Sequence, residues 1–176
     1  MKRILTLGLA MLIVLAGCST EIGNYRYQQP SLDIFRYFQG KTEAWGMVQD
    51  RSGKQLRRFH VDIDGDVVGD TLTLNERFVY DDGQKQQRVW HIRRIGAGRY
   101  EGTAGDIKGV ATGQAAGNAF NWRYSMNVTA SGSTWLLGFD DWMYLQDDTH
   151  LFNKTEIKKF GITVATVTLF FTRKTQ

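Results

Sequence analysis

Apolar and polar residues alternate along most of the chain after residue 41, and short clusters of turn-forming residues interrupt the alternation. Alternation places successive side chains on opposite faces of a strand. The spacing of the turns predicts about ten antiparallel strands, at 42–50, 55–63, 70–80, 84–94, 99–106, 109–116, 119–129, 134–146, 150–158 and 162–173. The turns expected between or beside them are RSGK (51–54), DGD (64–66), DDG (81–83), GAG (96–98), KG (108–109), ASGS (130–133), DDT (147–149) and KKFG (158–161).

Strands joined by such short turns form a meander, whose two edge strands would expose unpaired backbone groups. Closure into an up-and-down barrel removes those edges. We therefore expect an all-β fold, an antiparallel up-and-down β-barrel of about ten strands. A barrel of about eight strands or more can enclose a small ligand. A sandwich of two sheets with a filled core is the alternative.

The segment 120–143 predicts the register of one hairpin. If Ser131 and Gly132 form a two-residue turn, the inner face of the first strand is apolar at every second position. The cross-strand pairs are then Val128–Trp135, Met126–Leu137, Tyr124–Phe139, Trp122–Asp141 and Phe120–Met143. On the outer face, Arg123 lies opposite Asp140, which predicts an exposed ion pair of small energy.

This register also interprets the acidic stretch FDDWMYLQDD (139–148). Asp140 and Asp141 are adjacent in a strand, so their side chains point to opposite faces and cannot form a catalytic carboxylate pair. Asp147 and Asp148 fall in the next turn, where aspartate is favoured. Asp141 is expected inside, where an unpaired carboxylate is costly to bury. It therefore has a partner or lies near a wet barrel mouth.

The hairpin at 71–92 is best registered with a three-residue loop, Asp81-Asp82-Gly83, with the glycine in the left-handed conformation. This register pairs apolar residues with one another, whereas a two-residue turn does not. The resulting pairs are Leu72–Ile92, Leu74–Trp90 and Glu76–Arg88, on the same face as Phe78. Arg88 either holds the carboxylate or phosphate of an amphiphile or forms a rim ion pair with Glu76.

The N-terminus carries a different signal. Residues 2–3 are basic and residues 4–15 are apolar, which is typical of a secretory signal and too short for a spanning helix of about 20 residues. The signal ends in Leu-Ala-Gly-Cys, which resembles a bacterial lipobox, so we expect 1–17 to be removed and Cys18 to be acylated. Ser19 favours the outer membrane by the same resemblance. An ordinary signal with a chance cysteine, or a short membrane segment, is the alternative.

The rest of the chain is expected to form one domain. We predict a polar tether at 18–31, then a single β-barrel domain at 32–176 that opens with a short helical turn at 31–39. Ser31 would cap this turn, with Leu32, Phe35 and Phe38 on one side. Cys18 is the only cysteine, so no disulfide is expected.

Several kinds of chemistry have no support in the sequence. Loss of 1–17 would take two positive charges from a formal net charge of +4, and no basic cluster suited to nucleic acid remains. The three histidines stand on different predicted strands without zinc-site spacing, and DIDGD (62–66) lacks the order of a calcium loop. No nucleophile motif or phosphate-binding loop is present. We expect no cofactor, no metal and no enzymatic activity. An acyl-chain-modifying enzyme with Asp141 or Glu76 as acid/base is a further alternative.

Five stretches together resemble a family of uncharacterised proteobacterial lipoproteins with a domain of unknown function. They are LAGC, FRYFQGKTEAWGMVQDRSGK (35–54), GDTLTLNERFVYDDG (69–83), FDDWMYLQDD (139–148) and KFGITVATVTLFF (159–171). The chain is also distantly similar to lipocalins and other calycins, which have a helical turn before the first strand and bind a ligand inside the barrel. Gly40 and Trp45 are five residues apart, whereas the lipocalin Gly and Trp are two apart.

These observations lead to one functional hypothesis and one alternative. The hypothesis is an outer-membrane lipoprotein, facing the periplasm and anchored through Cys18, whose barrel binds or shuttles a fatty acid, a phospholipid or a similar hydrophobic ligand. The alternative is a structural or assembly module of the cell envelope with a filled barrel and a protein partner. The expected ligand-binding residues are Leu74, Glu76, Phe78, Arg88, Trp90, Trp122, Tyr124, Met126, Phe139 and Asp141.

Overall fold

The computed structural model of the protein describes residues 20–130 and 132–174. The predicted signal peptide and Cys18 lie outside the described residues. A 3-10 turn, η1 (Ile22–Tyr25), and a short helix, α1 (Ile34–Phe38), precede the sheet. The strands are β1 (Gly40–Asp50), β2 (Gln55–Val68), β3 (Thr71–Tyr80), β4 (Lys85–Gly96), β5 (Arg99–Ala104), β6 (Ile107–Ala116), β7 (Ala119–Ala130), β8 (Ser133–Leu145), β9 (His150–Lys159) and β10 (Ile162–Arg173).

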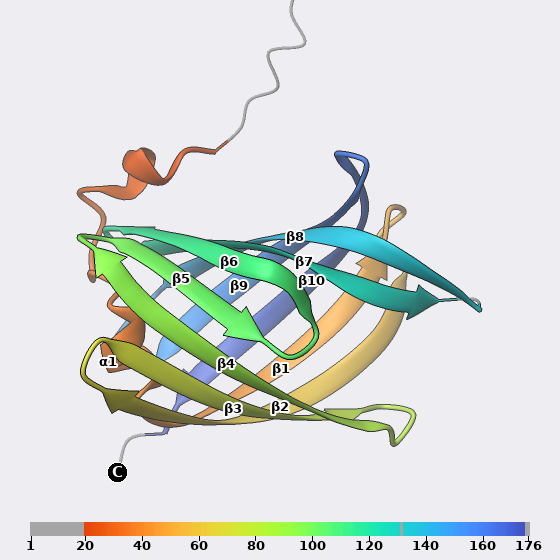
Figure 1. Ribbon diagram of the computed structural model, residues 1–176, viewed down its shortest axis with the longest axis horizontal. Coiled ribbons are helices and arrows are strands. Elements are labelled where there is room, and N and C mark those ends of the chain that lie inside the picture. Colours follow the sequence, from red (N-terminus) through yellow and green to blue (C-terminus); the bar gives the residue numbers. More distant parts are fainter. Residues whose placement is uncertain (1–19, 131, 175–176) are drawn as a thin grey trace, which may run out of the picture.

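The ten strands form a closed antiparallel barrel, which confirms the predicted fold and excludes the sandwich (Figure 1). Each strand pairs with its neighbours in sequence, and β1 pairs with β10 to complete the ring. Each described strand therefore has a neighbour on both sides, although the first five residues of β4 extend beyond the short strand β5.

Most predicted strand boundaries differ from the observed ones by one or two residues, but the turn predicted at 64–66 is wrong. These residues lie inside β2, where Gly65 pairs with Gly40 on one side and Leu74 on the other. The chain turns later, at Gly69, which has a positive φ of 58°. A strand of this length lets β2 span the barrel wall as far as the helix α1.

Both predicted hairpin registers are confirmed. In β7 and β8, Trp122 lies opposite Asp141 and Tyr124 lies opposite Phe139. In β3 and β4, Leu74 lies opposite Trp90, and Gly83 occupies the left-handed region at φ 81°. The alternation of side chains therefore fixed which residues face the barrel interior.

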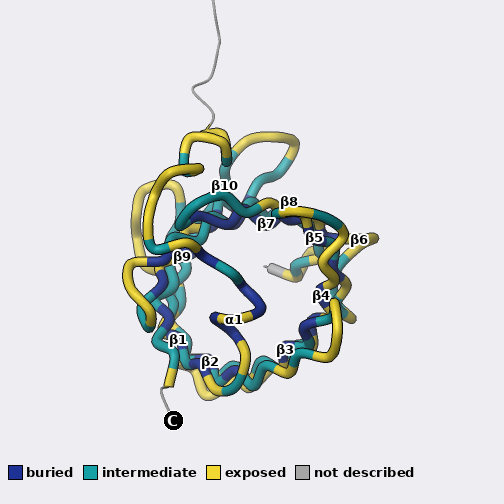
Figure 2. The backbone as a smooth tube through the Cα atoms, turned by 90° about the vertical axis from the view of Figure 1, so that its left-hand side faces the viewer, coloured by how far each residue is buried: buried dark blue, intermediate teal, exposed yellow. Residues whose placement is uncertain are grey.

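The helix α1 closes one end of the barrel. Figure 2 looks along the barrel and shows α1 within the ring of strands. Ile34, Phe35 and Phe38 are buried, and Phe38 packs edge-on against Phe171 of β10. The predicted cap, Ser31, is wrong: the Asp33 carboxylate accepts hydrogen bonds from the N–H groups of Phe35 and Arg36.

The predicted tether covers residues 18–31, and the structure describes it from residue 20 onward. This described part lies against the outside of the barrel. Tyr25 of η1 packs against Trp142 and Tyr144 of β8, with ring centroids 5.9 and 5.4 Å apart. The Leu32 N–H donates to the Gly117 carbonyl at 2.8 Å. Trp142 and Tyr144 face outward, so the alternation of residues along β8 does not predict which segment covers them.

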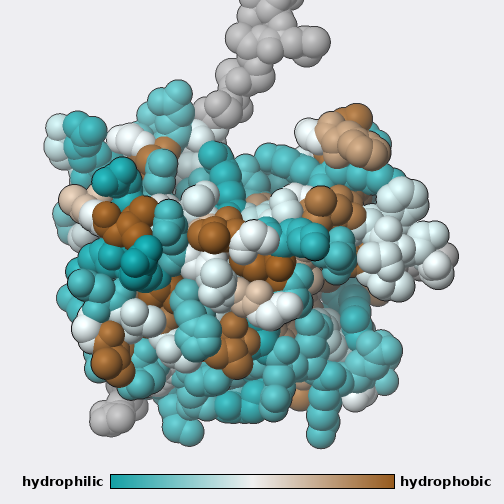
Figure 3. All heavy atoms as spheres, viewed as in Figure 1, coloured by the Kyte–Doolittle hydropathy of each residue, from teal (hydrophilic) through white to brown (hydrophobic). Residues whose placement is uncertain are grey.

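The face of the barrel seen in Figure 3 is mostly hydrophilic, with hydrophobic side chains in separated groups. Exposed apolar residues on the outer surface include Val79, Val89 and Val110. Among the described residues, no helix has the length and apolar character needed to span a bilayer.

Candidate functional site

The barrel interior contains a cavity of about 470 Å³. At one end its walls are buried residues next to α1, including Ile34, Phe38 and Phe171. At the other end it reaches Gln86 and Thr129, which are exposed near the hairpin tips. The cavity is thus a pocket that α1 closes and that opens between the hairpins on the opposite side.

Aromatic side chains form much of the pocket wall. Trp90 of β4 meets Trp122 and Tyr124 of β7 edge-on, at centroid distances of 5.5 and 5.3 Å. Tyr124 stacks on Phe139 of β8 at 5.0 Å. Such pairs add roughly 0.5–1.5 kcal/mol each beyond the burial of their area. The rigid wall they form suits the apolar body of a ligand.

Two glycines make room for this wall. A Cβ atom on Gly102 of β5 would lie 2.8 Å from the Trp122 ring, and one on Gly113 of β6 would lie 2.6 Å from it. These glycines belong to the Gly-rich segment 102–118. Because neither residue has a side chain, the Trp122 indole can pack directly against the backbone of β5 and β6.

The structure brings all ten predicted ligand-binding residues into the lining of this one cavity. They are Leu74, Glu76, Phe78, Arg88, Trp90, Trp122, Tyr124, Met126, Phe139 and Asp141. Their contact with a ligand stays a prediction. The prediction missed residues near the mouth, among them Arg57 and Tyr80, which lie 3.4 Å apart from guanidinium carbon to ring centroid.

Arg88 has a different partner from the one expected. Its cross-strand neighbour is Glu76, as predicted, but its guanidinium pairs with Asp106. Arg88 Nε and Nη2 donate to the two Asp106 carboxylate oxygens over 2.7–3.1 Å. Asp106 lies in the turn between the short strands β5 and β6, so it reaches the neighbouring strand β4 from the side. The predicted rim pair Glu76–Arg88 is therefore wrong.

Asp141 is buried in the pocket wall, so the second of the two alternatives, a wet barrel mouth, is wrong. The residue is 6% exposed, and its Oδ1 atom is buried without a hydrogen-bond partner. Burial raises the pKa of the Asp141 carboxyl to about 7, although the Thr155 hydroxyl and Arg88 act in the opposite direction. The group thus titrates near neutral pH.

Glu76 faces the same cavity from β3. Burial raises the pKa of its carboxyl to about 7; Arg88 lowers it, and the charges of Asp106 and Asp141 raise it further. No hydrogen bond or ion pair joins the Glu76 carboxylate to another residue in the described part of the chain.

On the outer surface, Arg123 Nε donates to Asp140 Oδ1 at 3.1 Å, as predicted, although only 16% of the Asp140 side chain is exposed. Lys158 and Asn121 also donate to this carboxylate, at 3.0 and 2.7 Å. Asp147 accepts hydrogen bonds from the backbone of Thr149 and His150, which confirms its turn role. The acidic stretch therefore serves three separate purposes.

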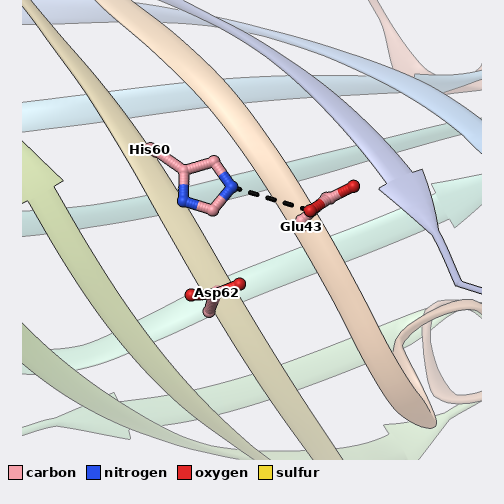
Figure 4. Close-up of side chains that lie close together, drawn as sticks. All are labelled: Glu43, His60 and Asp62. Carbon is pink, nitrogen blue, oxygen red and sulfur yellow. Dashed lines mark ion pairs between the residues drawn. The ribbon is translucent and has the colours of Figure 1, made fainter.

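A second cluster on the outer surface was not expected from the sequence. Figure 4 shows Glu43 of β1 beside His60 and Asp62 of β2. Glu43 lies opposite Asp62 in the register, and its Oε2 is 3.7 Å from His60 Nε2. These donors suit a divalent cation. The Lys174 ammonium lies 2.8 Å from the same Glu43 oxygen, so a cation would have to displace it.

Comparisons with known proteins place the fold more clearly than the function. The family model described as a protein of unknown function (DUF3833) matches residues 12–173. The solved structure of the S-type phycobiliprotein lyase CPES from Guillardia theta is similar at a TM-score of 0.57 and 9% sequence identity. The match covers 81% of this chain and 91% of that one. No curated protein is significantly similar in sequence. The structural likeness shows a shared barrel fold.

Proposed function

The chain belongs to the DUF3833 family, whose function is unknown, and we propose that its barrel binds or shuttles a hydrophobic or amphiphilic small molecule. The observation that carries this proposal is the pocket of about 470 Å³ with aromatic walls. Ligand pockets in proteins commonly measure about 300–1,000 Å³ and are mostly apolar with a few polar groups. The lumen has both properties.

The volume favours a ligand with a single chain. The cavity lies in the lower half of the range for small-molecule pockets. A fatty acid or another single-chain amphiphile fits this space better than a phospholipid with two acyl chains. A phospholipid would have to leave one chain outside the mouth.

We place this activity in the cell envelope. The lipobox-like signal supports acylation of Cys18 and attachment to the outer membrane, with the barrel facing the periplasm. In this proposal the protein is a carrier without enzymatic activity. A structural module with a filled barrel fits the geometry less well, because the cavity exceeds about 300 Å³, the lower limit for ligand pockets.

Native mass spectrometry of the purified protein, followed by extraction and identification of bound lipids, tests the proposal. We expect a bound mass of one small amphiphile, and uptake of at least one member of a panel of fatty acids, lysophospholipids, alkyl alcohols and alkylamines. An empty barrel that takes up none of the panel would overturn the proposal.

A further inference from the structure

Four charged side chains line the pocket, the cations Arg57 and Arg88 and the carboxyls Glu76 and Asp141. Arg57 is paired with Asp82, which lies outside the lining. The Arg88–Asp106 pair is closed on itself by its bidentate contact, with 13% of the Arg88 side chain exposed. Glu76 and Asp141 remain without an ion pair among the described residues, although Arg88 is near enough to lower the pKa of both.

Asp141 is the stronger indication of a ligand group. Its Oδ1 atom is buried without a hydrogen-bond partner while the residue lines the cavity. The Thr155 and Tyr124 hydroxyls favour the ionised form of Asp141, but a buried carboxylate oxygen without a partner is costly and calls for a further group to satisfy it. The residues beside it on β9 are Thr155 and Asn153, which carry no charge.

Glu76 faces Asp141 from the opposite wall, since β3 and β8 lie on opposite sides of the barrel (Figure 1). The other titratable groups that line the pocket are Tyr124 and Arg88, with Arg57 and Tyr80 nearer the hairpin tips. Phe59 of β2 and Leu169 of β10 are apolar parts of the same lining. A group placed between the two walls would therefore meet carboxyl oxygens on both sides.

We infer that the ligand carries a cationic group, such as a protonated amine, on its apolar body, and that this group lies between Glu76 and Asp141. The inference rests on the proposed function, because it specifies the ligand of the same pocket. A carboxylate head group would meet two like charges and would have to displace Asp106 to reach Arg88. A cation neutralises the two unpaired charges, and the aromatic wall adds cation–π attraction.

Isothermal titration calorimetry with dodecylamine, dodecanol and dodecanoic acid tests this at pH 8, below the micelle concentration of each probe. The three probes share one chain length and differ in head group. We expect the amine to bind at least about tenfold more tightly than the alcohol, and the acid to bind most weakly. Asp141→Asn and Glu76→Gln should each remove most of the preference for the amine. Asp66→Asn and Glu101→Gln, on the outer surface, make the same chemical changes and should leave it intact.

Each result decides one of the two proposals. If none of the three probes binds, the proposed function fails. If the acid or the alcohol binds as tightly as the amine, the proposed function stands and the cationic ligand is wrong. If the preference for the amine survives both inner substitutions, the amine binds elsewhere and the inference is wrong. Thermal melts of every variant confirm that a lost preference does not come from a lost fold.

Discussion

Glu76 and Asp141 connect the stability of the barrel to pH, because their pKa values of about 7 lie well above the values of about 4 expected in the unfolded chain. Between these limits the folded state holds more protons than the unfolded state, so stability falls as pH rises from about 4 to 7 and levels off above that. Carboxyls with a lowered pKa, such as Asp64 beside Arg77, have the opposite effect only in more acidic solution.

We therefore expect the ligand-free protein to be more stable at pH 5.5 than at pH 8, by an amount on the order of 1 kcal/mol or more. In the double variant Asp141→Asn, Glu76→Gln the difference should largely disappear, and stability at pH 8 should rise. Urea denaturation at both pH values measures this. Asp66→Asn serves as the surface control. A double variant with an unchanged pH dependence would contradict the assignment of these two groups.

Arg88 and Arg93 give a matched pair of arginines on one strand. The Arg88 side chain is 13% exposed and bidentate to Asp106, whereas that of Arg93 is 65% exposed and contacts Glu101 at 3.5 Å. We expect Arg88→Ala to lower the free energy of unfolding by about 2–3 kcal/mol, as for a lost hydrogen bond to a charged group. Arg93→Ala should cost less than about 1 kcal/mol. Equal costs in chemical denaturation would show that the Arg88–Asp106 pair contributes no special stability.

At the scale of elements, the close contact between α1 and β2 depends on one missing side chain. A Cβ atom on Gly65 would overlap the carbonyl oxygen of Phe38 at the end of α1. We expect Gly65→Ala to push the helix out of its place and to destabilise the protein by about 1–3 kcal/mol or more. Gly138→Ala is the control, since a Cβ there meets only Lys158 O at 3.9 Å.

Chemical denaturation measures the change in stability of Gly65→Ala. The rate of proteolysis near α1 in the ligand-free protein measures whether the helix is displaced. If Gly65→Ala and Gly138→Ala are equally stable and equally resistant, the helix tolerates the added methyl group and does not depend on this close approach.

The strand registers were predictable from the sequence, whereas some side-chain partners were not. The registers of β3–β4 and β7–β8 were predictable, because alternation and turn length leave one arrangement that pairs apolar residues with each other. These registers sufficed to bring the ten predicted lining residues together. The partner of Arg88 was not predictable, since Asp106 comes from a turn whose position depends on how short β5 and β6 are.

Two further errors have the same origin in three-dimensional packing. Asp33 caps α1 although Ser31 also fits the cap pattern, and the choice depends on where the chain enters the barrel. The segment DGD (64–66) has turn-forming residues but continues β2, because Gly65 is needed for the approach of Phe38. Local preference gave way to tertiary contact in both cases.

At the scale of the whole molecule, the predicted lipid anchor is testable without knowledge of the ligand. Cys18→Ser removes the only thiol that could be acylated. We expect the wild-type protein to incorporate labelled palmitate and to sediment with outer membranes, and the variant to lose both properties. Labelling and sedimentation that survive in Cys18→Ser would refute the anchor while leaving the barrel proposal untouched.

The helix α1 closes one end of the barrel, so in the proposed carrier a ligand would enter and leave at the hairpin end. A ligand that enters between the hairpin tips would leave by the same route, so the part of the ligand that enters last would leave first. A molecule that delivers the ligand and one that accepts it would therefore both contact the same part of the ligand, on the same side of the barrel. In that case the protein would exchange its ligand at one end of the barrel and would not pass it through.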